Sequence, residues 1–236
     1  MWEGQIPELS KSYRCITWDM RGHAMSDSPD DASMYNKQHQ VDDMRAVLDA
    51  CGVKQAVFLG HSMGAYDNML FYLGGYQSYV KAFIFFGTGP GFSKAKGRVG
   101  WNKQAEDLGA GYETKGLDAL VGSDKTKGHR TAVGLMHAAR KVFAQLDDDP
   151  LFVKFEEGAS VAALSLGKLA PPSVVIIGER DKGFAKAADM MVAKLPSAEK
   201  VLIADSGHMA NEKQPARFNA AVRNFLEGLS AARPRL

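Results

Sequence analysis

Three side chains in this sequence have the types needed for nucleophilic catalysis: a serine, a histidine and an aspartate. Ser62 lies in Gly60-His61-Ser62-Met63-Gly64, and Asp181 and His208 each follow an apolar run later in the chain. A serine hydroxyl becomes an effective nucleophile when a histidine takes its proton, and an aspartate orients that histidine and stabilises its charge. We therefore expect Ser62 to attack a carbonyl carbon, His208 to act as general base and then general acid, and Asp181 to orient it.

The residues around Ser62 predict a nucleophile elbow, which is a strand, a sharp turn and a helix in succession. The run 56–59 is apolar without alternation, as in a strand covered on both faces, and a helical pattern follows from Ala65. We expect side chains at Gly60 and Gly64 to collide with neighbouring backbone at so tight a turn. The backbone N–H of Met63, at the start of the helix, is then the expected oxyanion donor.

The acid and the base follow two later predicted strands. The strand 174–178 leads into Glu179-Arg180-Asp181, and the strand 201–204 leads into Asp205-Ser206-Gly207-His208. Carboxyl ends of parallel strands meet at one edge of a sheet, so both side chains can reach Ser62. Glu179 and Asp205 are neighbouring carboxylates, and Asp205 remains the alternative to Asp181 as the acid.

The chain resembles the α/β-hydrolase superfamily in three places. These are the elbow, the loop 19–26 that reads Asp-x-Arg-Gly-His-Ala-x-Ser, and the segment Gly-His with Asn211 and Gln214-Pro215 after it. Ala24 stands where the family loop has glycine. The order serine, aspartate, histidine is the one expected for this superfamily, and the pattern Gly-x-x-Asp selects Asp181. A serine nucleophile disfavours the dehalogenase and epoxide-hydrolase branches and favours acyl transfer to water, from esters, lactones, thioesters or ring-cleavage diketones.

The elements that must position these residues indicate an α/β fold: a mostly parallel, doubly wound sheet of the α/β-hydrolase type with an inserted helical cap. Strands are predicted at 13–18, 56–59, 80–86, 174–178 and 201–204, and helices at 38–51, 185–194 and 215–229. Between about residues 88 and 169 the alternation of strand and helix is lost. We therefore expect a core of 1–87 and 170–236 and a mainly helical cap of 88–169 over the nucleophile.

Several residues are candidates for lining the substrate site. His61 and Met209 lie beside the nucleophile and the base, and Trp101, Met136 and Phe143 of the cap indicate an apolar pocket, although packing explains them equally well. His129 and His137 of the cap are further candidates for substrate contact. His23 and His39 are expected to be surface or packing residues.

Composition limits the partners. The 29 basic and 27 acidic residues nearly balance, which argues against nucleic acid, and no apolar run is long enough to span a membrane. Cys15 and Cys51 indicate reduced thiols and hence a cytoplasmic protein. Metal-ligand spacing and phosphate-binding glycine motifs are absent, so no metal or cofactor is implied. The expected partner is a small-molecule substrate, and the oligomeric state is left open.

The resemblance also predicts that the sequence is truncated at its N-terminus. In relatives a strand ending in His-Gly precedes the helix expected at 1–9, lies in the sheet between the strands 13–18 and 56–59, and supplies a second oxyanion donor. Without this segment, those two strands are expected to pair directly. The loss of its oxyanion donor is expected to reduce transition-state stabilisation by about 3 kcal/mol. A non-catalytic, hydrolase-like binding protein is therefore the alternative function. For the enzyme, hydrolysis should rise with pH across roughly 6 to 8, since the base must be neutral.

Overall fold

The described part of the chain forms a parallel sheet with helices on both faces. The structure is a computed structural model that describes residues 1–236 except 93–94, 121–127, 130, 145–161, 163–164 and 232–236. The sheet has four parallel strands in the order β1-β2-β3-β4. Their bounds are β1 Ala56–His61, β2 Val80–Phe86, β3 Ser173–Gly178 and β4 Ala198–Ile203. This confirms the predicted α/β fold.

Successive residues of the two central strands are buried on opposite faces. Phe83 and Phe85 of β2 belong to one core cluster, and Ile84 and Phe86 belong to the other. A strand covered on both faces has no need of polar alternation, which is why β2 from Ala82 and β3 from Val174 read as continuous apolar runs. The first face is covered by α2 (Lys37–Ala50), α3 (Met63–Leu73) and α7 (Ala185–Lys194), and the second by α1 (Ile6–Leu9), α8 (Ala210–Lys213) and α9 (Pro215–Ala231).

Helix α3, which begins next to Ser62, is joined to α2 by a buried ion pair. Lys37 Nζ lies 2.6 Å from Asp67 Oδ1, and each side chain is only 2% exposed. Gln40 donates to the other carboxylate oxygen of Asp67, and the Lys37 ammonium lies 5.5 Å from the centre of the Tyr66 ring. The pair thus fixes the elbow helix against α2 where water cannot screen the charges.

Replacing Lys37 by methionine is expected to lower the free energy of unfolding by about 3 kcal/mol, because Asp67 would remain buried without its counter-charge. The double variant Lys37→Met, Asp67→Leu should regain most of that loss. Urea unfolding of the three proteins measures both effects. The control is Lys103→Met, which removes a pair whose side chains are 73% and 62% exposed and should change stability little. A Lys37→Met protein as stable as this control would contradict the expectation.

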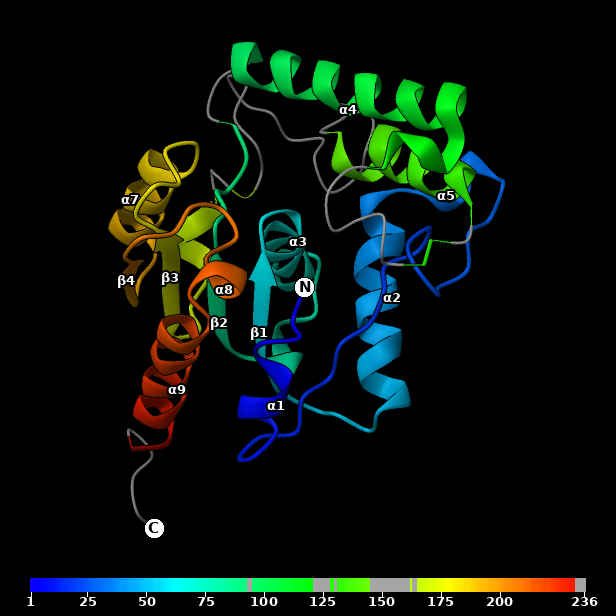
Figure 1. The fold of residues 1–236 in the computed structure, drawn as a ribbon. Helices are drawn as coiled ribbons and strands as arrows, with labels where there is room; N and C mark the ends of the chain where they lie inside the picture. Colours follow the sequence, from blue (N-terminus) through cyan, green and yellow to red (C-terminus); the bar gives the residue numbers. More distant parts are fainter. Residues whose placement is uncertain (93–94, 121–127, 130, 145–161, 163–164, 232–236) are drawn as a thin grey trace.

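Residues 95–143 contribute helices that lie beyond the carboxyl ends of the strands. They are α4 (Ala95–Lys115), η3 (Gly116–Ala119), α5 (Ala132–His137) and the π-helical turn η5 (Ala138–Phe143). Figure 1 shows α4 and α5 on the side of the sheet toward which the β1 arrow points. We call these four elements the cap helices. The predicted boundaries of core and cap remain a prediction, and part of the expected cap falls outside the described residues.

One predicted strand is wrong. Residues 13–18 form no strand, and β1 pairs with β2 but not with this segment. The β-branched and aromatic residues there favour a strand, but a strand forms only where a neighbouring strand can hydrogen-bond to it. Instead, Cys15 packs against the core cluster of α1 and α9, while Trp18 is 41% exposed.

Cys15 and Cys51 are free thiols, as predicted, and both are half-buried; burial raises the pKa of Cys15 above its usual value. Within the described ranges, no helix has the length and apolar character that crossing a membrane requires.

Candidate active site

Ser62 lies on the sharp turn between β1 and α3. Its backbone has φ 53° and ψ −115°, a conformation that a non-glycine residue adopts only when its surroundings impose it. An added Cβ at Gly60 would lie 2.5 Å from the backbone nitrogen of Ala65, so the turn requires glycine there. The parallel expectation for Gly64 is wrong, because an added Cβ there meets no described atom within 4 Å.

Residues at the end of β2 form hydrogen bonds to the strained turn. The Ser62 N–H donates to the Phe86 carbonyl at 2.9 Å, and the Thr88 hydroxyl donates to the Ser62 carbonyl at 2.8 Å. Thr88 is 3% exposed. Sequence reasoning missed Thr88, although its position just past the end of a predicted strand placed it at the active edge of the sheet. Both backbone groups of Ser62 are therefore fixed, and the residue as a whole is half-buried.

The structure brings Asp181 and His208 together. His208 Nδ1 donates to Asp181 Oδ2 at 2.8 Å, with side chains 37% and 6% exposed respectively. A buried carboxylate at Nδ1 selects the tautomer whose Nε2 carries a lone pair. The His208 ring also lies beside Gly87, where an added Cβ would approach Nδ1 to 3.2 Å. Because Gly87 follows Phe86, the hydrogen-bond partner of Ser62, the imidazole lies at the same edge as the elbow.

The loops that carry Asp181 and His208 are bound to each other. Arg180 N–H donates to the Ser206 carbonyl at 2.8 Å, and a Cβ at Gly178 would lie 2.2 Å from the Gly207 carbonyl oxygen. Asp205, the alternative acid, is engaged elsewhere: its carboxylate forms ion pairs with Arg180 at 2.7 Å and Arg217 at 3.7 Å and is 59% exposed.

His61 faces the histidine loop. Its Nε2 lies 2.9 Å from the main-chain oxygen of His208, and the two rings are 4.4 Å apart. The centre of the His61 ring also lies 4.5 Å from that of the Phe86 ring. His61 therefore contacts His208, the predicted base, directly. The role of His61 as a substrate-binding residue remains a prediction.

Of the three other predicted pocket residues, Trp101 and Met136 pack among the cap helices, and contact of all three with substrate remains a prediction. Trp101 donates from Nε1 to the Phe143 carbonyl at 2.8 Å and packs on the Phe143 ring, so it joins α4 to η5. Met136 packs against the cluster of Tyr112, Leu120 and Leu135 among the cap helices. Met209 immediately follows His208 and precedes α8. Met63, by contrast, packs its side chain against Tyr35, Ala138 and Val142, and so makes an apolar contact between elbow and cap helices.

The loop 19–31 also joins core and cap helices, and histidines provide the contacts. His129 Nδ1 accepts from the Ala24 N–H at 2.9 Å, and His137 Nε2 lies 3.0 Å from the Asp30 carbonyl oxygen. Ala24 has φ 41°, which explains why glycine suits this position. His23 lies against His129, with ring centres 5.8 Å apart, whereas the His39 backbone N–H donates to the helix-capping side chain of Asn36.

The charged residues of the same loop have a structural role. Arg21 makes two hydrogen bonds to the Asp43 carboxylate, at 2.7 and 3.0 Å, and these raise the pKa of Arg21 above its usual value. This contact joins the loop to α2, and so these charges hold the loop in place.

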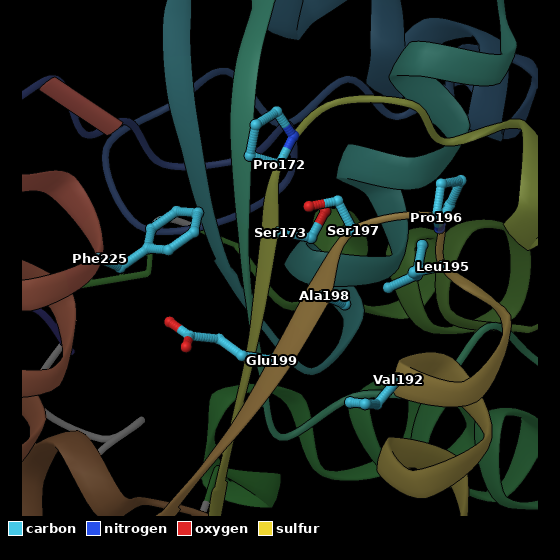
Figure 2. Close-up of a pocket in the computed structure, with 9 residues that line it drawn as sticks. All are labelled: Pro172, Ser173, Val192, Leu195, Pro196, Ser197, Ala198, Glu199 and Phe225. Atoms are coloured by element: carbon cyan, nitrogen blue, oxygen red, sulfur yellow. The ribbon is translucent and has the colours of Figure 1, made fainter. Parts of the chain in front are cut away.

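A cavity of about 500 Å³ lies away from these residues. It is found where β3 and β4 begin, and Figure 2 shows Ser173 and Ala198 there with Leu195 and Phe225 nearby. Asp181 and His208 follow the other ends of these strands, about 20 Å along a six-residue strand. The cavity is therefore not part of the candidate active site. In the part of the chain that the structure describes, no three His, Cys, Asp or Glu side chains gather in a way that could hold a metal ion.

Comparisons with known proteins agree with the fold. The family model described as alpha/beta hydrolase fold matches residues 1–109. The 3-oxoadipate enol-lactonase 1 of Acinetobacter baylyi is 26% identical over 97% of this chain and 84% of its own. The 2-hydroxymuconate semialdehyde hydrolase of Pseudomonas sp. (strain CF600) is 25% identical over 98% of this chain and 82% of its own.

Among solved structures, MenH from S. aureus superposes with a TM-score of 0.79 at 17% identity, covering 97% of this chain and 89% of MenH. That structure shares the fold. The family model and the two sequence matches, which cover nearly the whole chain, support membership of the α/β-hydrolase superfamily and a hydrolase activity.

Proposed function

We propose that the protein hydrolyses a small, largely apolar ester, lactone or related carbonyl compound through an acyl-enzyme on Ser62. The observation that carries this proposal is the hydrogen bond between His208 Nδ1 and the buried Asp181 carboxylate, at the edge where the strained turn displays Ser62. These three residue types, in this order along the chain, supply nucleophile, base and orienting acid. Metal or cofactor chemistry is not needed for this reaction.

The reaction has two steps. Ser62 Oγ attacks the carbonyl carbon while His208 Nε2 takes its proton, and the leaving oxygen departs with that proton. Water then attacks the acyl-enzyme with His208 again as base, which releases the acid and returns the proton to Ser62. In both steps the Met63 N–H at the start of α3 stabilises the negative oxygen, aided by the helix dipole.

The described surroundings favour an apolar substrate of modest size. The contact of Met63 with Tyr35, Ala138 and Val142 makes the cap side of the elbow apolar. The two similar proteins are named for a lactone and for a semialdehyde. We therefore place esters and lactones first among substrates, ahead of compounds cleaved at a carbon–carbon bond.

The acyl-enzyme is tested by measuring how its acyl group partitions between water and methanol. Two esters with the same acyl group, p-nitrophenyl butyrate and phenyl butyrate, are hydrolysed in buffer containing methanol, and methyl butyrate and butyric acid are measured. We expect the same product ratio from both esters, because both form one butyryl-enzyme. A ratio that depends on the leaving group would contradict a shared intermediate. A γ-lactone and a ring-cleavage diketone tested in parallel would rank the substrate classes by kcat/KM.

A further inference from the structure

Two aromatic rings lie against the imidazole of His208. The Phe184 ring stacks on it with ring centres 5.0 Å apart and planes inclined by 14°. The His61 ring lies 4.4 Å away at 50°. The near-parallel neighbour is therefore Phe184, a residue that the sequence does not single out.

Phe184 and Asp181 are presented by one hydrogen-bonded turn. The N–H groups of Phe184 and Ala185 both donate to the Asp181 carbonyl, at 3.3 and 3.2 Å, and Phe184 caps the start of α7. Phe184 also packs against the core cluster of α3 and α7. The turn that delivers the carboxylate to Nδ1 thus delivers a ring to the face of the same imidazole, and the core anchors that ring.

The two contacts restrain different motions. A hydrogen bond at Nδ1 fixes one atom, so the ring can still pivot about it and carry Nε2 away from Ser62. A parallel ring on the face blocks that pivot. The contact persists when His208 gains a proton, because the negative face of an aromatic ring attracts a cation.

We infer that Phe184 is a positioning residue, which holds the plane of His208 so that Nε2 stays directed at Ser62. This inference rests on the proposed function. It predicts that a ring at position 184 is required, beyond the volume that it fills.

The test compares Phe184→Leu, which keeps most of the volume, with Phe184→Tyr, which keeps the ring. For hydrolysis of p-nitrophenyl butyrate we expect Phe184→Leu to lower kcat about tenfold with KM unchanged, the size of effect expected for an aromatic pair that acts in the transition state. Phe184→Tyr should stay within about twofold of the wild type. Phe225→Leu, in α9 beside the cavity at the far end of the strands, is the matched control and should keep its kcat.

The results distinguish failure of the inference on Phe184 from failure of the proposed serine mechanism. If Ser62→Ala is inactive and Phe184→Leu keeps the wild-type kcat, the inference on Phe184 is wrong and the serine mechanism stands. Equal losses of kcat in the Leu and Tyr variants would also overturn it, since the ring would not matter. If Ser62→Ala remains active, the proposed function itself fails. Thermal unfolding of all variants measures the loss of packing independently of kcat.

Discussion

Replacing Ser62 by alanine is expected to lower kcat on the order of 10⁵-fold, because the variant has no oxygen that can form the acyl-enzyme. The exposed Ser230→Ala, in α9, should keep full activity and serves as the matched control. Hydrolysis of p-nitrophenyl butyrate by purified proteins measures both. Alanine in place of serine removes one oxygen at a backbone that is already fixed through Phe86 and Thr88, so the variant should fold as the wild type does. A kcat within tenfold of the wild type would exclude Ser62 as the nucleophile.

Replacing Asp181 by asparagine is expected to lower kcat by about 10³- to 10⁴-fold, because an amide can stabilise the wrong tautomer of His208 and cannot balance its positive charge. Asp205→Asn is the matched control, since it makes the same change at the alternative carboxylate and keeps a residue that tolerates the positive φ of 58°. We expect Asp205→Asn to retain kcat within about threefold, as expected for loss of an exposed ion pair. The reverse ranking of the two variants would make Asp205 the acid.

The sequence predicted those parts of the fold where the local pattern of residues agrees with the burial that the whole fold imposes. β2 from Ala82 and β3 from Val174 are apolar without interruption because both faces are covered. Helix α7 spans the predicted residues because it begins after the loop of Asp181 and ends shortly before Pro196. Asp181 and His208 were placed together because parallel strands bring their following loops to one edge.

The parts that could not be predicted depend on tertiary contacts. The segment 13–18 has the composition of a strand, yet only a neighbouring strand can turn that preference into structure. An apolar stripe on a helix does not tell whether it faces a ligand or another helix. Met136 and Trp101 pack among the cap helices, and their contact with substrate stays a prediction. Thr88 and Phe184 act through contacts with residues far along the chain, which spacing does not reveal.

The central claim is that Ser62 is activated by a histidine, and covalent labelling tests it most directly. The purified protein is incubated with a fluorophosphonate, digested, and mapped by mass spectrometry. We predict a single adduct on the peptide that contains Ser62, absent in Ser62→Ala and formed far more slowly in His208→Ala. A folded protein that hydrolyses its substrate yet gains no adduct at Ser62, or is labelled equally fast without His208, would contradict the account.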